Sequence, residues 1–495
     1  MLKRIKSLLT PEIIFLFIIL LISFVVRVYR IDQLLGFYYD QGRDASVIWD
    51  LIYHHRFFLI GPTTGIAGIF RGPWYYWLIT PFYWLGHGNP VYPSVFLSFT
   101  VVLALVLLYK VGVRAGGKAS GFLAIIIGGL SYDIVMASRW LSNPTPMFLI
   151  SMLFLYSLFM ILDGKKWAWI VTGFSAGLAM QFGSATEVFY FPALAIFILW
   201  QWKNLPNWKI ILFSLVALAI TVVPQVLFDF KHGHILAKNI YAFIFTKGTF
   251  KISFWQMVQI RLPFYYNLFA SKLFSDNHLL ASIFLSISAL LLVLQSKTLF
   301  KNRNFVIIFI FFVAPLIGML FFQGNEGNVY DYYFTGYYLI FVLLFAIVYG
   351  LAWKHTWGKV LIIIFALLFI NENLYKVKNY INSGVDGPSA IALGSEKLAI
   401  DWIYKDAKGR DFSVDEYVPP VIPYAYIYLY TWLGTTKYHQ LPDEKRVPLL
   451  YTLYEIDPPH PERLEAWLTR QKGIGKVEAS DSFGGITAQR RIRIK

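Results

Sequence analysis

Apolar stretches long enough to cross a lipid bilayer recur along most of this 495-residue chain. A membrane-spanning helix needs roughly 17–25 mostly apolar residues. In lipid, its backbone groups must find their hydrogen-bond partners within the helix itself. Hydropathy therefore predicts a mainly α, polytopic membrane helical bundle with about eleven spans, at approximately residues 11–29, 92–111, 120–138, 145–162, 167–183, 186–202, 208–228, 279–295, 304–322, 333–352 and 357–372.

The amino-acid composition agrees with a membrane protein. Charged residues make up only 15% of the chain and hydrophobic residues 57%, whereas soluble domains carry about 25% charge. Aromatic residues reach 19%, as expected where rings gather at the membrane–water interfaces. The absence of cysteine excludes a disulfide framework, a thiolate nucleophile and a cysteine-ligated zinc ion.

The formal net charge of +16 could indicate nucleic-acid binding, but the basic residues cluster in short loops between apolar stretches. If the N-terminus is cytoplasmic, every predicted inner loop is basic, as the positive-inside rule requires. We therefore expect no nucleic-acid partner, and an uncleaved first helix in the cell membrane. The basic positions are Lys3, Arg4 and Lys6; Lys110, Arg114 and Lys118; Lys165 and Lys166; Lys203 and Lys209; Lys297, Lys301 and Arg303; Lys354 and Lys359.

Three segments then fall on the outer side: the loops 30–91 and 229–278, and the C-terminal region 376–495. The first loop is expected to contain a helix at 43–56 and an aromatic interfacial helix at 72–84, which is too short to span. A second interfacial helix is expected at 250–274. Residues 1–375 would thus form the membrane domain.

The region 376–495 is more polar than the rest of the chain. Residues 389–407 and 460–472 show helical periodicity, whereas 412–415 and 486–494 alternate as strands do. The sequence therefore predicts a small α/β domain outside the membrane.

The richest polar cluster opens the first outer loop, where Asp40 and Asp44 lie four residues apart. On a helix they would share one face, and either carboxylate could take a proton from an attacking hydroxyl. A purely structural alternative has Asp40 as the N-cap of a helix beginning near Arg43, with Asp44 as a first-turn acid favoured by the helix dipole.

Three motifs resemble those of the C-type glycosyltransferases that use polyprenyl-phosphate sugars. The relatives in question are the protein O-mannosyltransferase family and its bacterial cousins, including the aminoarabinose transferase of lipid A. The architecture of residues 10–370 resembles theirs as well. The motifs are Tyr39-Asp40-Gln41-Gly42, then Gly72-Pro73-Trp74-Tyr75-Tyr76-Trp77-Leu78, and Ala137-Ser138-Arg139-Trp140 followed by Pro144.

This resemblance implies that Asp40 is the catalytic base, with Asp44 as a possible substitute. Gln41 stands where the family often has Glu, and this departure argues against a two-acid mechanism or a metal site, although a divalent metal ion is kept as a possible cofactor. Cations must stabilise the departing phosphate, and arginine can bind its oxygens in bidentate fashion. The candidates for this donor-phosphate role are Arg139, Arg71, Arg43, Lys231 and Arg261; each of these could instead be an interfacial structural cation.

The resemblance also implies substrate-lining residues at the outer membrane edge. They are Tyr39, Tyr75 and Tyr76 of the first loop, and Glu326, Asp331 and Tyr332 beside the tenth predicted span. An ordinary polar loop with an aromatic belt would have the same composition. The pair His232 and His234 is only weak support for a metal site.

The implied function is a mannosyltransferase-like membrane transferase. It would move a sugar from a polyprenyl-phosphate donor to a hydroxyl or amine of a protein, lipid or glycan acceptor, with inversion at the anomeric carbon. No Walker, GxGxxG-before-helix or HExxH motif occurs, which argues against an ATP-driven pump, a nucleotide-sugar enzyme and a zinc protease. A transporter or flippase and a non-catalytic protein with a transferase-like fold are the alternatives.

Overall fold

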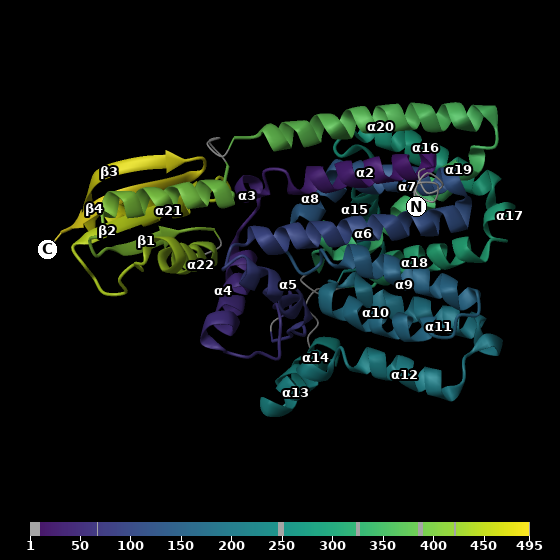
Figure 1. The fold of residues 1–495 in the computed structure, drawn as a ribbon, viewed down its shortest axis with the longest axis horizontal. Helices are drawn as coiled ribbons and strands as arrows, with labels where there is room; N and C mark the ends of the chain where they lie inside the picture. Colours follow the sequence, from purple (N-terminus) through teal and green to yellow (C-terminus); the bar gives the residue numbers. More distant parts are fainter. Residues whose placement is uncertain are drawn as a thin grey trace, which may run out of the picture.

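The computed structural model describes residues 10–66, 68–245, 252–322, 327–384, 390–419 and 422–494. Most helices run along the long axis of the molecule, and a small domain with a β-sheet lies at one end (Figure 1). Three short helices lie between this domain and the bundle, namely α3 (Ile31–Leu34), α4 (Tyr39–His54) and α5 (Trp74–Leu85) (Figure 1). The C-terminus lies in the small domain, and the described N-terminal residues lie towards the opposite end of the bundle.

The expected membrane-spanning stretches are all helical. Four helices are each long and apolar enough to cross a bilayer: α2 (Pro11–Val28), α6 (Val91–Gly116), η4 with α19 (Asp331–Ala352), and α20 (Thr356–Asn382). Shorter apolar helices cover four further stretches: α9 (Met147–Leu162), α10 (Ala168–Phe182), η1 with α11 (Thr186–Trp200), and α18 (Arg303–Met319). The polytopic helical bundle is confirmed, while the number of crossings stays a prediction.

Three further pairs of helices are bent at short breaks. They are α7 (Lys118–Leu130) with α8 (Tyr132–Arg139) at 58°, α12 (Trp208–Ala219) with α13 (Val223–Lys231) at 54°, and α15 (Phe254–Phe274) with α16 (His278–Leu294) at 101°. The spans expected at 120–138 and 208–228 are therefore not straight helices. The near-perpendicular α15 fits the expectation that this segment lies along the membrane.

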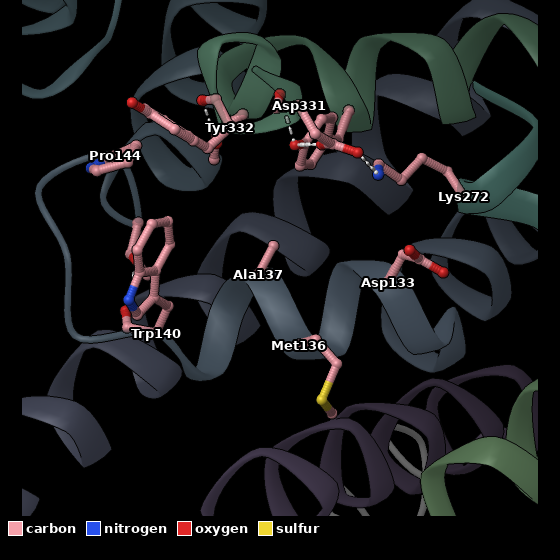
Figure 2. Close-up of a pocket in the computed structure, with 11 residues that line it drawn as sticks. Asp133, Met136, Ala137, Trp140, Pro144, Lys272, Asp331 and Tyr332 are labelled. Carbon is pink, nitrogen blue, oxygen red and sulfur yellow. Dashed lines mark hydrogen bonds and ion pairs between the residues drawn. The ribbon is translucent and has the colours of Figure 1, made fainter. Parts of the chain in front are cut away.

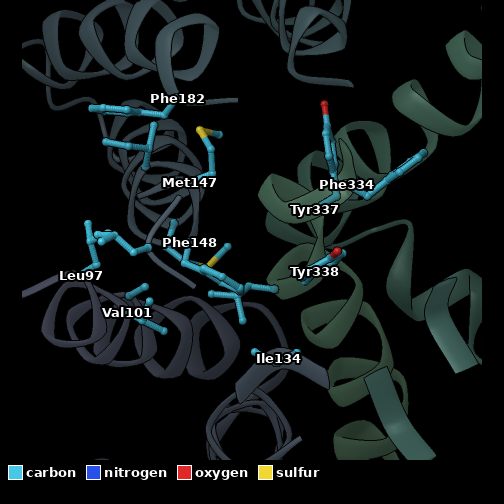
Figure 3. Packing of buried hydrophobic residues seen from close by; sticks show 14 of the residues in the cluster. Leu97, Val101, Ile134, Met147, Phe148, Phe182, Phe334, Tyr337 and Tyr338 are labelled. Atoms are coloured by element: carbon cyan, nitrogen blue, oxygen red, sulfur yellow. The ribbon is translucent and has the colours of Figure 1, made fainter. Parts of the chain in front are cut away.

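The bundle core forms around α19, whose side chains are buried on nearly every face. Tyr337 and Tyr338 pack among apolar side chains of α6, α8, α9 and α10 (Figure 3). The α19 helix also packs closely against α7. A helix that is apolar all round lies either in a protein core or in lipid, and the burial of α19 places it at the centre of the bundle. Figure 3 labels Leu97, Val101, Ile134, Met147, Phe148, Phe182 and Phe334 in this core.

The remaining helices are short and connect these elements. They are α3 (Ile31–Leu34), α4 (Tyr39–His54), α5 (Trp74–Leu85), η2 (Trp202–Asn204), α14 (Ile235–Phe245) and α17 (Ser296–Leu299). The helix expected at 43–56 begins four residues earlier, at Tyr39, so the boundary that the sequence suggested near Arg43 is wrong. Gly42 lies within the helix although glycine disfavours helix interiors, and the backbone of Tyr424 packs directly against it.

The C-terminal domain is a four-stranded sheet with helices, as expected. Its strands are β1 (Ser413–Tyr417), β2 (Leu449–Glu455), β3 (Gly475–Phe483) and β4 (Ile486–Arg493), in the order β1-β2-β4-β3. Strands β1 and β2 are parallel and the other pairs antiparallel. Its helical elements are α21 (Leu393–Ala407), α22 (Tyr424–Leu433), the π-helical turn η5 (Gly434–Tyr438) and α23 (Pro461–Lys472). The sequence had not indicated β2, β3 or α22.

This domain is joined to the first outer loop through α22. A Cβ atom on Gly42 of α4 would lie 2.3 Å from the backbone carbonyl carbon of Tyr424, so only glycine permits this approach. The rings of Tyr39 and Tyr424 meet edge to face at 4.9 Å. The hydroxyl of Tyr428 donates a hydrogen bond of 2.5 Å to the carbonyl of Gly88.

The domain boundary expected between residues 375 and 376 stays a prediction, since α20 continues to Asn382.

Candidate active site

The first turn of α4 places an acidic cluster at the end of the bundle that faces the C-terminal domain. Arg43 bridges its two aspartates: Nη1 lies 2.8 Å from Asp40 Oδ1 and Nη2 lies 2.7 Å from Asp44 Oδ1. The two acids thus lie on one face of the helix, as their spacing predicted. Asp40 lies in the first turn rather than at the N-cap, which is Tyr38.

The environments of the two aspartates differ sharply. The side chain of Asp40 is 58% exposed, whereas that of Asp44 is 8% exposed. Asp44 Oδ1 also accepts a 2.7 Å hydrogen bond from the hydroxyl of Tyr76. Burial raises the pKa of Asp44 to about 6, although Arg43 and Tyr76 act in the opposite direction. Asp44 therefore has the partners of a structural acid, and Asp40 is the carboxylate that an incoming molecule can reach.

A pocket of about 310 Å³ opens near this cluster. Its wall on α8 carries Asp133, Met136 and Ala137, and Trp140 and Pro144 close one side (Figure 2). Its other wall is the η4 segment (Asp331–Tyr337) and the start of α19, which add Asp331, Tyr332, Thr335 and Tyr338. Aromatic rings beside carboxylates suit a sugar, which has apolar faces and many hydroxyls.

An ion pair between a buried lysine and a half-exposed aspartate lies in the wall of this pocket. Lys272 Nζ lies 2.8 Å from Asp331 Oδ2, and the side chain of Lys272 is only 2% exposed (Figure 2). The ammonium group also lies 4.4 Å from the ring centroid of Tyr338, whose hydroxyl donates to Asp331. An oxygen of Asp133, facing the same pocket, is buried without a hydrogen-bond partner among the described residues. The pocket therefore holds one cation and two acids.

Arg71 lies in the loop between α4 and α5, and its guanidinium group has no ion pair or hydrogen bond within the described ranges. Burial lowers its pKa below the ordinary arginine value. Its charged neighbour is the carboxylate of Glu187, and it also lies within electrostatic reach of Tyr332, as Asp40 does. Tyr332 is therefore the common neighbour of the exposed carboxylate, the unpaired arginine and the pocket.

The other expected phosphate ligands have structural partners or lie elsewhere. Arg139, the last residue of α8, donates to the carbonyls of Val26, Arg27 and Tyr29 at 2.9–3.2 Å. Arg261 donates to the carbonyls of Met319, Phe322 and Gly327. Arg43 is held by the two aspartates and by Thr63. Lys231 lies exposed at the end of α13. The free cation that the structure brings to the site is Arg71.

Some of the expected substrate-lining residues line the pocket, and the others have structural contacts or lie outside the described residues. Tyr332 and Asp331 line the pocket. Tyr76 holds Asp44, Tyr75 is buried beside it, and Tyr39 packs on Tyr424. Glu326 lies outside the described residues.

No three histidine, aspartate or glutamate side chains converge in the part of the chain that the structure describes. His234 lies 3.4 Å from Asp229, and both are remote in the chain from the acidic cluster. The charged neighbour of Asp40 is the cation Arg43. This donor set does not fit a divalent ion, so the possible metal stays a prediction without described ligands.

Lys272 was not among the sequence-based candidates. A signal was available, because it is a lone cation in the apolar run Leu268-Phe269-Ala270-Ser271-Lys272-Leu273-Phe274. A charge in such a run needs a partner when it is buried. The partner, Asp331, lies 59 positions away, and only the fold identifies it.

The fold is similar to that of the solved structure of ArnT. ArnT from Cupriavidus metallidurans bound to undecaprenyl phosphate superposes with a TM-score of 0.61 at 11% identity, covering 97% of each chain. Its apo state gives a TM-score of 0.60 at 12% identity with the same coverage. The archaeal oligosaccharyltransferase AglB from Archaeoglobus fulgidus, in complex with an inhibitory peptide and a dolichol-phosphate, gives a TM-score of 0.49 at 10% identity, covering 94% of this chain and 72% of that one.

The class is therefore an integral membrane protein with the fold of the C-type glycosyltransferases. Within the chain, residues 71–228 match the family model described as dolichyl-phosphate-mannose-protein mannosyltransferase. The resemblance stated from the sequence motifs is thereby confirmed. Comparison with curated proteins gives no significant match.

Proposed function

We propose that this protein is a membrane glycosyltransferase that moves a sugar from a polyprenyl phosphate to a hydroxyl or amine of an acceptor. The observation that carries the proposal is the convergence of Asp40, Arg71 and the aromatic pocket around Tyr332. The exposed carboxylate can serve as a base, and the unpaired guanidinium can serve as a phosphate ligand. The match of residues 71–228 to a mannosyltransferase family supports the same chemistry.

In this mechanism the Asp40 carboxylate takes the proton from the acceptor hydroxyl as its oxygen attacks the anomeric carbon. A bond forms between that oxygen and the carbon, and the bond from the carbon to the phosphate oxygen breaks. The phosphate leaves with the bonding electron pair. Because the attack comes from the face opposite the leaving group, the anomeric configuration inverts. Arg43 keeps the carboxylate in place through the 2.8 Å ion pair.

The departing phosphate gains negative charge, and cations directed at it lower the barrier. Arg71 suits this role because none of its donors is used by the described residues. Lys272 contributes a second positive charge in the pocket wall, although Asp331 shares it. Arg139, Arg43 and Arg261 already donate to carbonyls or carboxylates, so they stabilise the framework in this proposal.

The proposed setting is the outer face of the cell membrane, with the N-terminus cytoplasmic. The basic inner loops support this orientation. The C-terminal domain would then lie outside the cell, where its helix α22 holds α4 and Asp40. The donor is a lipid-linked sugar, and the acceptor is a protein, a lipid or a glycan. No step in the mechanism uses a metal ion.

The test is a transfer assay with purified full-length protein in liposomes. A panel of radiolabelled polyprenyl-phosphate sugars is offered with membrane extract as acceptor. Wild type is compared with Asp40→Asn and with the matched control Asp50→Asn. Asp50 lies on the same helix and pairs with His54 and Arg56, away from the pocket. Equal folded yield of the three proteins is checked by gel filtration.

We expect Asp40→Asn to lower the transfer rate at least a hundredfold, the range of a lost general base, and Asp50→Asn to retain it. Loss in Asp44→Asn alone, with Asp40→Asn active, would move the base to Asp44. A wild type that transfers no sugar from any donor, but moves a lipid-linked sugar across the bilayer, would replace the proposal with a flippase.

A further inference from the structure

Two glutamine side chains hold the main chain on both sides of Arg71. The N–H of Gly72 donates a 2.7 Å hydrogen bond to Gln181 Oε1. Gln225 Nε2 donates a 2.8 Å hydrogen bond to the carbonyl of Phe70. The two amides are joined to each other, because Gln181 Nε2 donates to Gln225 Oε1 at 2.9 Å. The residues immediately before and after Arg71 are thus fixed by one continuous chain of hydrogen bonds.

This chain has only one consistent direction. The backbone N–H of Gly72 can only donate, so Gln181 must present its oxygen there and its nitrogen to Gln225. Gln225 must then present its oxygen to Gln181 and its nitrogen to the Phe70 carbonyl, which can only accept. Each amide is therefore held in one orientation, with its oxygen and one of its N–H groups paired.

The packing leaves little room for an alternative arrangement. Gln181 on α10 is 1% exposed. A Cβ atom on Gly72 would lie 2.3 Å from Gln181 Oε1, so a larger residue at position 72 would displace the Gln181 amide. Trp74, two residues on, donates a 2.7 Å hydrogen bond from its indole to the carbonyl of Thr221. Both α10 and the α12–α13 break thus anchor the loop.

The side chain of Arg71 is held far less firmly than its backbone. Its backbone is held on both sides, whereas its guanidinium group has no partner among the described residues. A cation that binds a phosphate must keep its donors free and still point in one direction. The fixed backbone can set the direction of the Arg71 side chain, because no contact of the guanidinium group with a described residue does so.

We infer that Gln181 and Gln225 are positioning residues, which orient Arg71 for binding the phosphate of the lipid-linked donor. This inference rests on the proposed function, in which Arg71 binds that phosphate. Neither glutamine touches the substrate; both act through the loop that carries Arg71. Their loss should therefore weaken recognition of the phosphate group and leave recognition of the lipid chain unchanged.

The test measures binding of undecaprenyl phosphate to the detergent-purified full-length protein, with undecaprenol as the reference that lacks the phosphate. Gln225→Met is the main variant, because Gln225 is only partly buried and the change preserves its length. Gln181→Leu is the second variant. Arg71→Met is combined with each. Asn239→Leu is the matched control, since Asn239 donates a 3.0 Å hydrogen bond to Gly68 of the same loop, three residues before Arg71.

We expect Gln225→Met to weaken undecaprenyl phosphate binding about tenfold, as for a misdirected charge-assisted hydrogen bond, and to leave undecaprenol binding unchanged. In the Arg71→Met background the same change should cost nothing further, because the two residues act as one unit. Asn239→Leu should leave the phosphate preference at its wild-type value.

Four results would overturn the inference. Losses that add in the double variant would mean that the glutamines act independently of Arg71. A loss in Asn239→Leu equal to that in Gln225→Met would mean that any loosening of the loop has this effect. If Arg71→Met weakens binding and neither glutamine variant does, the inference fails while the phosphate role of Arg71 stands. An Arg71→Met variant that binds undecaprenyl phosphate as the wild type does removes that role, and the inference with it.

Discussion

Arg27 and Arg139 each donate hydrogen bonds to the last carbonyls of a neighbouring helix. Arg27, on α2, donates to the carbonyls of Gly128 and Gly129 at the end of α7, at 3.1 and 2.8 Å. Arg139, at the end of α8, donates in return to the carbonyls of Val26 and Arg27 at the end of α2, at 2.9 and 3.0 Å. The last carbonyls of a helix lack partners within it, so this exchange is what permits the break between α7 and α8 inside the bundle.

The first prediction concerns this exchange. Arg27→Met should lower the melting temperature in detergent by several degrees, because each buried carbonyl left unpaired costs about 1–3 kcal/mol. Arg27→Lys should restore little, since one ammonium group lacks the planar fork that reaches several carbonyls. Lys118→Met is the control: Lys118 also pairs with α2, through Glu12, but its side chain is 66% exposed. Equal melting temperatures for Arg27→Met and Lys118→Met would contradict the prediction.

The second prediction concerns the contact of α4 with α22. Alanine is the better helix former by about 1 kcal/mol, so helix propensity alone predicts that Gly42→Ala stabilises α4. The added Cβ atom would lie 2.3 Å from the Tyr424 backbone, however, and the two helices would have to separate. We expect a lower melting temperature and a lower transfer rate. Gly473→Ala, whose Cβ would meet Arg470 at 3.5 Å, should change neither; a stabilised Gly42→Ala would show that the helices can shift freely.

The third prediction is a pH dependence of stability that arises in the C-terminal domain. Burial raises the pKa of Glu455 from 4.5 to about 7, against a 2.9 Å hydrogen bond from Tyr426. Between these two pKa values the folded protein holds the proton that the unfolded chain releases. Stability is therefore lost as the pH rises from about 4.5 to 7, by roughly 3 kcal/mol in total.

Glu455→Gln should remove this loss, because the amide cannot ionise. The variant should therefore gain melting temperature over the wild type at pH 8, and gain much less at pH 5. Thermal unfolding of both proteins at the two pH values measures the difference. Glu462→Gln, at a side chain 68% exposed, is the control and should show no such gain. The same difference at both pH values would refute the assigned environment of Glu455.

The fourth prediction separates stability from activity at the pocket. Lys272→Met leaves Asp331 as an unpaired acid beside a buried site and should lower both stability and transfer rate. Adding Asp331→Asn removes that uncompensated charge and should restore stability, because it is the unpaired charge that destabilises. The transfer rate should stay low, since the pocket still lacks its cation. A double variant with wild-type transfer would show that Lys272 is purely structural.

Asp40 illustrates what local sequence could predict about the site. Its place just after the first apolar stretch and its spacing from Asp44 predicted two acids on one helical face, and the structure has them there. The start of α4 was mispredicted because Gly42 disfavours a helix locally. Tertiary packing outweighs that cost, since α22 approaches α4 only where a side chain is missing.

The arginines show the opposite case. Arg139 and Arg71 were both candidates for binding the donor phosphate in the sequence, and the family resemblance favoured Arg139. The two terminal nitrogens of Arg139 donate to carbonyls at the end of α2, whereas the guanidinium group of Arg71 has no hydrogen bond or ion pair with a described residue. The difference between the two arginines depends on which backbone carbonyls lie near each guanidinium group. Those near Arg139 belong to a segment about a hundred residues away in the chain.

The sequence by itself determined the membrane class, the helical bundle and the presence of a small α/β domain, because hydrophobic length and periodicity are local properties that lipid and water select directly. Tertiary structure alone decided which charged groups are free. Lys272 meets Asp331, Gln181 meets Gly72, and Gly42 meets Tyr424 across separations of 59 to 382 residues. Such pairings depend on how the whole bundle closes, since a charge or an amide acquires its partner only when distant segments are packed together.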